Sequence, residues 1–594
     1  MKCFINIMML FSDQRRTGDK GPMMKDTKIK LLDCTLRDGA YVVDAKFGTP
    51  AIKGIISKMT EAGADIIECG WLKDKPHEEG TSFYHLPDDI RPYLTKKDKD
   101  TTYVVMIDWN RYDTSVLPPC DHETIDAVRV VFPHGRHKEG AEIAEKIRDK
   151  GYDIYLQAAN TLAYSDEDLK VLSATVNELH PKAISIVDTF GAMYETDLDR
   201  ITDILDDNLE SDIALGFHSH NNQQLSFALT SHFAERMRNK GRECMVDATL
   251  CGMGRGAGNT TTELIASYLN RRMSAAYDMN AILDAIDTYM PYFLENYRWG
   301  YSTPYFIAGL YCCHVNNIAY LLKNHRTNSR DMRNIIESMD PADRRQYDYD
   351  LLEEKYMENQ NRIVDDEKTV EDLRGILSGR EVILVAPGKS IDKDYDKIQA
   401  YIKDHEPVVI GVNAINKRYR YDYLFFVNSV RYDYAREVYE DEFNSIPHIV
   451  LSNIKTCRGE TPEDGKAGYA TGSGVTGSED KEGSGQQADD LSGREYIVNF
   501  SRVIKRGWEH FDNAVINALR LLTHLKVRNI AIAGFDGFKH KYNESYADAS
   551  LPTLNPDGKW DELNEEIKDM YGDFIRSEGR DCSISFVTES IFEK

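Results

Sequence analysis

The sequence predicts an α/β protein: a parallel (β/α)8 TIM barrel, then a helical segment, then a second, Rossmann-like α/β domain. Three observations carry this prediction. Short aliphatic runs alternate with charged, helix-length stretches between residues 28 and 270, and eight such units are what a closed parallel barrel needs. The alternation resumes after residue 380. A chain of 594 residues is also too long for one hydrophobic core, so we expect at least two domains.

Eight short runs supply the expected strands of the barrel, residues 28–270. Most neighbours are separated by a helix-length segment, such as residues 49–63 after the first run. A doubly wound open sheet is the structural alternative, but no dinucleotide-type glycine loop follows the first run. The runs are 28–33, 65–70, 103–108, 127–132, 152–158, 183–188, 213–218 and 244–250.

The segments that follow are expected to be helical. Residues 271–330 carry apolar residues at helical spacing and form an appendage that packs on the barrel or makes an oligomer contact. We therefore expect a homo-oligomer. Residues 331–379 are charged and helix-prone, and they are expected to connect the two halves of the chain.

Residues 380–594 form the expected Rossmann-like domain. Within them, residues 459–493 are rich in Gly, Ser and acidic residues, which predicts a disordered surface loop. The expected strands are 381–387, 407–413, 422–428, 447–453, 495–500, 529–535 and 584–588.

Composition limits the partners and the compartment. The net charge of −25 argues against nucleic acid or an anionic membrane as partner. Ten scattered cysteines without a Cys-x-x-Cys favour reduced thiols in the cytoplasm. No apolar run is long enough to cross a membrane. Residues 1–27 form an N-terminal extension whose apolar part precedes its basic residues, the reverse of a signal peptide; a true start at Met23 or Met24 is the alternative.

Two histidines follow the seventh run, in "IALGFHSHNNQQ". Side chains alternate along a strand, so His218 and His220 face the same way, about 7 Å apart. Two converging imidazoles are half of a divalent-metal site. The alternative is that one histidine caps a helix and the other makes a core hydrogen bond.

Other polar residues gather at the carboxyl ends of the same strands, where barrel enzymes place their chemistry. The first run leads into Arg37 and Asp38. One Asp and two His residues with open positions form a 2-His-1-carboxylate metal site. For Asp108 and Thr189 a helix cap is the simpler explanation. The polar residues at the other strand ends are Glu68, Asp108, Gln157, Asp188 and Thr189.

Three motifs, "TLRDG", "FHSHNN" and "GMGRGAGNTTTE", resemble those of the DRE-TIM metallolyases, over roughly residues 28–325. The most similar subgroup is the 4-hydroxy-2-oxovalerate aldolases, which cleave 4-hydroxy-2-oxoacids to pyruvate and an aldehyde. The resemblance implies that Asp38, His218 and His220 bind Mn²⁺ or Mg²⁺, with Asn259 as a further ligand. Arg37 would then stabilise the enolate of pyruvate. The residue types suit this chemistry, because a divalent ion is a Lewis acid and a guanidinium supplies planar donors.

Substrate contacts are expected from Glu68, Asp188, Thr189 and Arg255. Arg255 lies in the glycine-rich segment "GMGRGAG". Either the backbone amides of this segment bind a phosphate or carboxylate, or the segment only forms a tight turn. Tyr41 stands where the aldolases carry a catalytic histidine. It either transfers a proton or packs against the substrate, and with a pKa near 10 tyrosine is a poor base.

The segment "VILVAPGKSI" resembles the first strand and turn of a Rossmann-like family that includes methanopterin-pathway diphosphokinase-like and motility-associated glycosyltransferase-like domains. The resemblance implies a nucleotide or sugar nucleotide bound by Gly388, Lys389 and Ser390. The spacing is not that of a Walker motif. The alternative is a module that docks partners or has lost catalysis.

The leading hypothesis is a divalent-metal-dependent aldolase or lyase of 2-oxoacids. One alternative is a Claisen-type acyltransferase of the isopropylmalate synthase or HMG-CoA lyase kind, against which the chain lacks an acidic residue directly after "TLRDG". The other is a nucleotide- or glycan-binding scaffold with a structural barrel. Against it, a purely structural barrel gains nothing from a buried cluster of charge.

Overall fold

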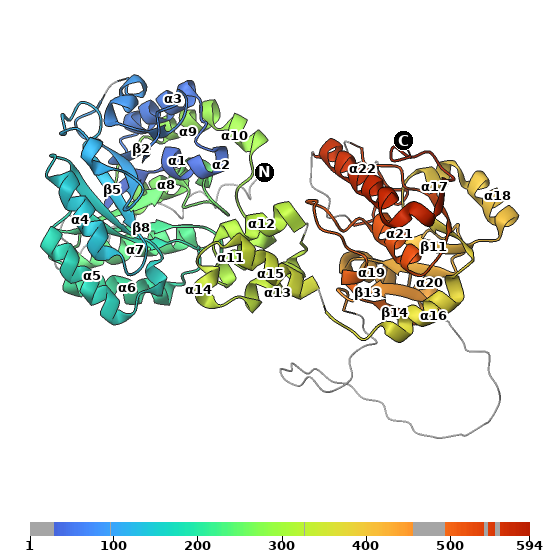
Figure 1. The fold of residues 1–594 in the computed structure, drawn as a ribbon. Helices are drawn as coiled ribbons and strands as arrows, with labels where there is room; N and C mark the ends of the chain where they lie inside the picture. Colours follow the sequence, from blue (N-terminus) through green and yellow to red (C-terminus); the bar gives the residue numbers. More distant parts are fainter. Residues whose placement is uncertain are drawn as a thin grey trace, which may run out of the picture. The chain divides into compact units, whose positions relative to one another are not determined.

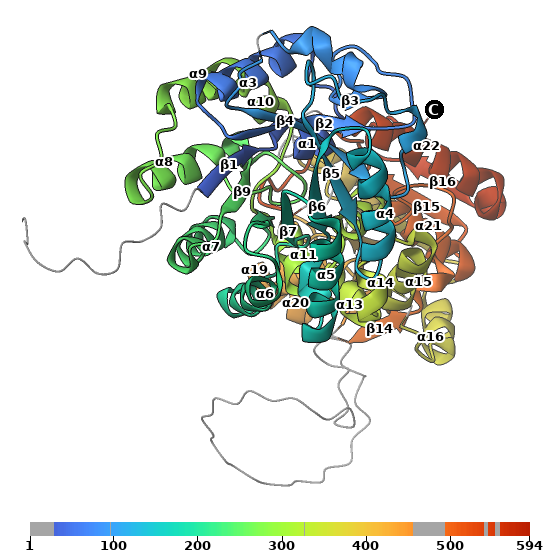
Figure 2. The same ribbon diagram turned by 90° about the vertical axis from the view of Figure 1, so that its left-hand side faces the viewer.

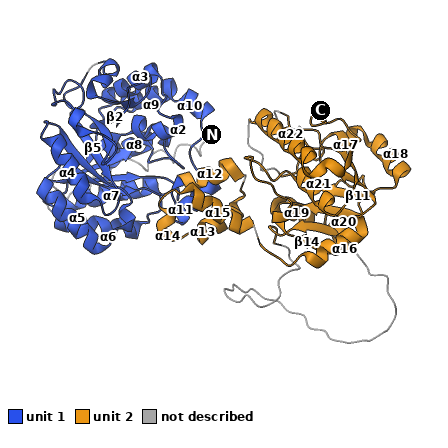
Figure 3. Ribbon diagram, in the orientation of Figure 1, with its two compact units in different colours: residues 1–315 blue, residues 316–594 orange. Residues whose placement is uncertain are grey.

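The computed structural model describes residues 29–593, apart from residues 96, 326, 361, 456–493, 540–544 and 553–558. The chain divides into two compact units, residues 1–315 and 316–594 (Figure 3). The predicted N-terminal extension and the predicted loop at 459–493 lie outside the described residues.

Eight parallel strands close into a barrel in the first unit, which confirms the predicted fold (Figure 1). Their order around the barrel is β1-β9-β8-β7-β6-β5-β4-β2, the β1–β2 pair closes it, and the two-residue strand β3 (Phe83–Tyr84) pairs with β2. The barrel strands are β1 (Ile29–Asp33), β2 (Ile66–Leu72), β4 (Thr102–Asp108), β5 (Ala127–Phe132), β6 (Asp153–Ala158), β7 (Ala183–Asp188), β8 (Ala214–Ser219) and β9 (Cys244–Ala248).

Helices surround these strands (Figure 2). They are α3 (Thr49–Glu61), α4 (His137–Arg148), α5 (Asp166–Leu179), α6 (Glu195–Asn208), α7 (Ser226–Lys240) and α8 (Thr262–Arg272). Two connections carry only a 3-10 helix, Pro87–Tyr93 after β2 and Thr114–Val116 after β4. Pro92 lies inside the first, and a proline removes a hydrogen bond that a longer α-helix would need.

The barrel interior has an apolar layer near the amino ends of the strands and a charged layer nearer their carboxyl ends. Because side chains alternate along a strand, every second residue points inward. The first inward positions form an apolar cluster that includes Ile66, Ala127 and Met245. Two residues further along the same strands stand Glu68, Arg129 and Asp247, which are 0–1% exposed. The charged layer therefore lies next to the carboxyl ends of the strands, beneath the expected site.

The helices α9 (Met279–Tyr289) and α10 (Pro291–Asn296) pack against the barrel, and their apolar residues belong to the barrel's core. Gly54 on α3 permits this contact, because a Cβ there would lie 1.9 Å from the ring of Tyr289. The segment continues as α11 (Thr303–Leu310) and α12 (Val315–His325).

The second unit holds a seven-stranded parallel sheet in the order β14-β13-β12-β11-β10-β15-β16, and all seven predicted strands are present. The strands are β10 (Glu381–Val385), β11 (Val408–Val412), β12 (Tyr423–Phe426), β13 (His448–Leu451), β14 (Glu495–Val498), β15 (Asn529–Ala533) and β16 (Ser583–Phe586). Its helices are α13 (Ser329–Ser338), α14 (Pro341–Arg344), α15 (Tyr349–Gln360), α16 (Glu367–Leu377), α17 (Ser390–Lys393), α18 (Tyr395–His405), α19 (Ser429–Val438), α20 (Glu440–Ser445), α21 (Ala514–His524) and α22 (Trp560–Arg576). None of the described helices has the length and apolar character to span a bilayer.

Candidate metal centre and active site

The turn after β1 carries Arg37 and Asp38 on the short helix α1 (Thr35–Asp38). Asp33, the last residue of β1, accepts hydrogen bonds from the hydroxyls of Thr35 (3.1 Å) and Thr262 (2.8 Å). These bonds tie the turn to the segment that follows β9. The local sequence thereby fixes Asp38 at the carboxyl end of the barrel.

Asp38 meets the two histidines of β8 and its following loop. The Oδ2 atom of Asp38 lies 3.6 Å from Nε2 of His218 and 3.4 Å from Nε2 of His220. One ligand atom from each residue lies within 4.8 Å of the others. Asp38 is 0% exposed and His218 is 3% exposed. The predicted 2-His-1-carboxylate set is therefore assembled in one place.

Both imidazoles have their second nitrogen occupied. The Nδ1 atom of His218 lies 3.0 Å from Oδ2 of Asp247, and Nδ1 of His220 lies 3.0 Å from the backbone oxygen of Asp188. Each oxygen accepts a hydrogen bond from Nδ1–H, so in the neutral imidazole the lone pair lies on Nε2, the nitrogen nearer Asp38. The buried Nε2 of His218 has no hydrogen-bond partner among the described residues. A divalent ion bound by these three residues would satisfy it.

A buried chain of ion pairs orients Arg37. Asp247 accepts from Nη2 of Arg129 at 2.5 Å, and Nη1 of Arg129 donates to Glu68 at 2.9 Å. Glu68 also accepts from Nε of Arg37 at 2.7 Å. Burial alone would raise the pKa of Asp38, but Arg37 and the two imidazoles hold that pKa well below its usual range. Asp38 is therefore a carboxylate at neutral pH.

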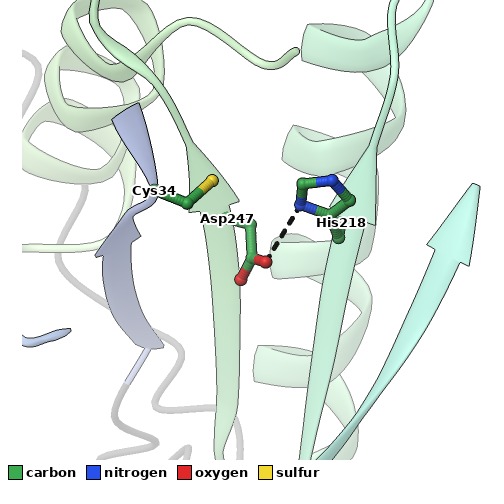
Figure 4. A group of neighbouring side chains, drawn as sticks. All are labelled: Cys34, His218 and Asp247. Atoms are coloured by element: carbon green, nitrogen blue, oxygen red, sulfur yellow. Dashed lines mark hydrogen bonds and ion pairs between the residues drawn. The ribbon is translucent and has the colours of Figure 1, made fainter. Parts of the chain in front are cut away.

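A second group of potential ligands shares His218 (Figure 4). Its other members are Cys34 and Asp247. Burial raises the pKa of the Cys34 thiol, which stays protonated, and Asp247 is already bonded to Arg129. We therefore assign this group to the support of His218 rather than to metal binding.

Asn259 lies against Asp38. Its Nδ2 donates to Oδ2 of Asp38 at 2.5 Å and to the backbone oxygen of Met253 at 3.2 Å. Its buried Oδ1 has no hydrogen-bond partner among the described residues. The close packing requires glycine at residue 254, where a Cβ would lie 2.1 Å from the Asn259 amide. The side-chain oxygen of Asn259 therefore lies beside Asp38 with its lone pairs available to a metal ion.

A cavity of about 660 Å³ opens over this group. Of the four residues predicted to bind substrate, Thr189 and Arg255 line it. Glu68 and Asp188 do not: Glu68 bonds to the two arginines, and the carboxylate of Asp188 accepts from the backbone amides of Ala192 and Met193. The lining includes Arg37, Asp38, Tyr41, Trp71, Asp108, Gln157, Thr189, His218, His220, Arg255 and His314.

Comparison with known proteins identifies the barrel. Residues 135–288 match the family model described as HMGL-like. The barrel is an HMGL-like domain of the DRE-TIM superfamily. A Mycobacterium tuberculosis protein named oxaloacetate decarboxylase is 25% identical over 259 residues, 43% of this chain and 74% of that protein. A 4-hydroxy-2-oxovalerate aldolase from Pseudoalteromonas translucida is 24% identical over 283 residues, 45% of this chain and 78% of the aldolase.

Among solved structures, the N-terminal domain of an aldolase candidate from Bacteroides vulgatus is 23% identical, with a TM-score of 0.42. The match covers 49% of this chain and 95% of that one. The family model and the two named relatives, rather than this structural match, place the HMGL-like barrel with carbon–carbon lyases and aldolases at the level of the superfamily.

Tyr41 stands at the mouth of the HMGL-like site. It is 42% exposed, and the guanidinium of Arg255 lies 3.8 Å from its ring centroid. Desolvation in the pocket raises the pKa of Tyr41 to about 12, more than Arg255 and Arg37 lower it. Tyr41 is therefore a neutral phenol at physiological pH, suited to donating a hydrogen bond.

The residues of this site that were not predicted from the sequence include Arg129, Asp247 and His314. A signal existed for the first two, because each is ionisable and stands in an otherwise aliphatic strand, "AVRVVF" and "CMVDATL". No such signal exists for His314. It lies between two helices, and helical periodicity does not indicate which end of a barrel the segment covers.

The turn after β10 lies where strand order reverses, between β10 and β15. The backbone amide and hydroxyl of Ser390 both donate to Asp536, at 2.8 and 2.5 Å. A Cβ at Gly388 would lie 2.4 Å from the backbone oxygen of Gly534. Gly388 lines a cavity of about 890 Å³ together with Asn413, Arg431 and Tyr546, whereas Lys389 and Ser390 do not line it.

Proposed function

We propose that the barrel is a divalent-metal-dependent lyase that cleaves, or forms, a 4-hydroxy-2-oxoacid from pyruvate and an aldehyde. One observation carries the proposal: buried Asp38 converges with two imidazoles whose Nδ1 atoms are already engaged. Asp38, His218 and His220 would hold Mn²⁺ or Mg²⁺, with the oxygen of Asn259 as a further donor. When bound, the ion supplies Lewis acidity at the 2-oxo group of the substrate.

Arg37 is the group we propose for stabilising the enolate. Its Nε is bonded to Glu68, and its Nη1 lies 3.1 Å from Asp38. Its buried Nη2 has no hydrogen-bond partner among the described residues. A donor fixed in this way needs no reorganisation when negative charge develops on the substrate oxygen.

The cleavage also needs an acceptor for the 4-hydroxyl proton. Tyr41 is a poor acceptor, because its pKa is raised to about 12. We propose Asp108, which lines the same cavity and whose pKa is raised by burial, more than Arg111, Lys73 and Arg255 lower it. A carboxylate with a raised pKa is a stronger base. Tyr41 would then donate a hydrogen bond to the distal half of the substrate.

The test follows pyruvate released from a panel of 4-hydroxy-2-oxoacids, with Mn²⁺ or Mg²⁺ and again after chelation. Cleavage that is lost on chelation, restored by the metal and abolished in Asp38→Ala supports the proposal. Asp121→Ala, a change at an exposed acid outside the cavity, serves as the control. Full activity after chelation, or in Asp38→Ala, would contradict the ligand assignment.

The match to an oxaloacetate decarboxylase favours a second candidate, decarboxylation of a 2-oxodicarboxylate. Loss of CO₂ from C4 leaves the same pyruvate enolate, so Arg37 would serve either reaction. Oxaloacetate belongs in the panel for this reason. CO₂ release without any aldehyde product would favour the decarboxylase.

For the second unit we propose a nucleotide or sugar nucleotide as ligand of the cavity beside Gly388. Ligands of open parallel sheets bind where strand order reverses. The guanidinium of Arg431, 7% exposed, lies 4.8 Å from the ring centroid of Tyr546 in the cavity wall. Calorimetric titration with nucleoside di- and triphosphates and sugar nucleotides tests the proposal, with Arg431→Gln expected to abolish binding.

A further inference from the structure

The barrel cavity is lined by two guanidinium groups with different surroundings. Arg37 is bonded to Glu68 and lies against Asp38. Arg255 comes from the glycine-rich segment after β9. In the part of the chain that the structure describes, no carboxylate lies within the 4.0 Å ion-pair distance of Arg255. Arg255 therefore brings a positive charge to the cavity wall that its own surroundings do not neutralise.

Two uncharged groups hold Arg255 in position. Its guanidinium carbon lies 3.8 Å from the ring centroid of Tyr41, and its Nη1 lies 3.3 Å from Nε2 of His314. Burial, followed by Arg255 and His220, lowers the pKa of His314 to about 3. The neutral imidazole accepts a hydrogen bond from Arg255. His314 thus orients the guanidinium without cancelling its charge.

Asp108 is a carboxylate that could neutralise the charge of Arg255, because it lines the same cavity. Its closest cation is Arg111, with Nη1 at 3.9 Å from Oδ2, and Lys73 also lowers its pKa. Arg255 acts on it more weakly than either. Asp108 is therefore balanced mainly by residues other than Arg255.

We propose that the substrate carries a second anionic group, a carboxylate or phosphate, on the half that becomes the aldehyde, and that Arg255 binds it with His314 as its positioning residue. The inference rests on the proposed function of the same site. Because Arg37 is assigned to the pyruvate half, we assign the second fixed cation of the same cavity to an anionic group on the other half. A charged hydrogen bond of this kind changes affinity by about 10- to 100-fold.

Matched substrates test the inference. 4-Hydroxy-2-oxopentanedioate and 4-hydroxy-2-oxopentanoate differ only in whether C5 is a carboxylate or a methyl group, and 4,5-dihydroxy-2-oxopentanoate 5-phosphate supplies the phosphate. We expect kcat/KM to be about 10- to 100-fold higher for one of the two anionic substrates than for the methyl compound. Cleavage of all three at equal kcat/KM would overturn the inference and leave the proposed function standing.

Binding measurements test the second anionic group even if none of the three substrates is cleaved. 2-Oxopentanedioate and 2-oxopentanoate lack the 4-hydroxyl group and cannot undergo the cleavage. Titration in the presence of Mn²⁺ should show the dianion bound about 10- to 100-fold more tightly, and Arg255→Gln should bring that ratio close to one. Lys73→Gln is the matched control, a nearby cation outside the cavity lining, and should keep the ratio. Equal affinities in the wild type would overturn the inference.

The role of His314 has its own pair of variants. His314→Phe removes the acceptor and should lower the dianion preference through a higher KM, with a smaller change in kcat. His314→Gln keeps an acceptor and should restore part of the preference. Equal preference in the wild type and in His314→Phe, with the fold intact by circular dichroism, would remove His314 from this role.

Discussion

The Nδ1 atom of His218 lies 3.0 Å from Asp247, a carboxylate that points into the barrel rather than into the cavity. Asp247 is held in turn by Arg129. A residue that does not line the substrate cavity thereby determines which nitrogen of His218 faces Asp38. In an HMGL-like barrel, this makes the interior of the strands part of the candidate metal site.

Asp247→Asn should weaken metal binding by about 10- to 100-fold, because a neutral amide replaces the carboxylate that orients His218 and fixes its tautomer. The affinity for Mn²⁺, measured by titration calorimetry or electron paramagnetic resonance, checks this. Asp212→Asn is the control, since Asp212 also pairs with a histidine, His180, at 3.1 Å but on the exposed surface. An unchanged Mn²⁺ affinity in a folded Asp247→Asn protein would refute the prediction.

Arg37→Lys should lower kcat by about 100-fold or more, because an ammonium group lacks the planar fork that bonds to Glu68 through Nε and fixes Nη2 as a separate donor. Steady-state kinetics on a cleaved substrate measure the effect. Arg91→Lys, at an exposed arginine paired with Asp88, should change neither kcat nor KM. A loss confined to KM would remove Arg37 from the enolate role.

Arg129→Met should destabilise the barrel by about 3–5 kcal/mol, because Glu68 and Asp247 would keep buried charges without their common partner. Urea unfolding measures the free energy. Arg91→Met, which breaks an exposed ion pair, should cost no more than about 1 kcal/mol. Similar losses in the two variants would show that the buried pairs contribute little.

Asp108→Asn should slow cleavage by about 10²- to 10⁴-fold if Asp108 accepts the 4-hydroxyl proton. Tyr41→Phe removes only a donor and should cost about tenfold. Single-turnover rates separate these effects from product release. The reverse order, with Tyr41→Phe the more damaging, would make Tyr41 the proton-transfer group.

The ion pair of Asp366 with Arg502 should make the stability of the second unit depend on pH. Burial alone would raise the pKa of Asp366. Both of its oxygens accept from Arg502 at 2.6 Å, the backbone amide of Asn499 donates to it at 2.8 Å, and together these bonds hold the pKa below its ordinary value of 3.8. A depressed pKa stabilises the fold above the unfolded-state pKa and loses that effect as the pH falls through the folded-state pKa. Asp366→Asn should therefore cost about 2 kcal/mol at pH 7 and progressively less below about pH 4.

Urea unfolding of the wild type and Asp366→Asn across this pH range provides the measurement. Asp372→Asn is the control, because Asp372 pairs with Arg494 at 3.1 Å on the exposed surface. Its cost should be below about 1 kcal/mol at every pH. A pH-independent cost for Asp366→Asn would contradict the assignment.

The strands were predictable because a parallel barrel strand is buried on both faces and reads as a continuous aliphatic run. The eight predicted runs coincide with the barrel strands to within two residues at every end. The metal triad was predictable for a related reason: strand ends share one edge of a barrel, so Asp38, His218 and His220 had to lie near one another. Their roles as ligands stay a prediction.

Side-chain partners that depend on packing were less predictable. Arg129 of β5 pairs with Glu68 of β2, two strands away, and with Asp247 of β9, across the barrel, a relation that local sequence does not encode. His314 lies between α11 and α12, outside the strands whose ends form the rest of the site, and it lines the cavity only through the tertiary fold. Ser390 was expected to face a phosphate, and Asp536, 146 residues later, is its hydrogen-bond partner.

The pairing of β1 with β9 has a consequence for synthesis on the ribosome. Ile29 pairs with Cys244, so one edge of the first strand stays without its neighbour until more than 200 further residues have been translated. An unpaired strand edge is a template for joining another chain. Tyr277 is translated later still, and its hydroxyl accepts a hydrogen bond from the backbone amide of Leu31 in the first strand. The nascent barrel therefore depends on protection of its first strand, and a pause in translation before residue 244 would be the moment of greatest exposure to aggregation.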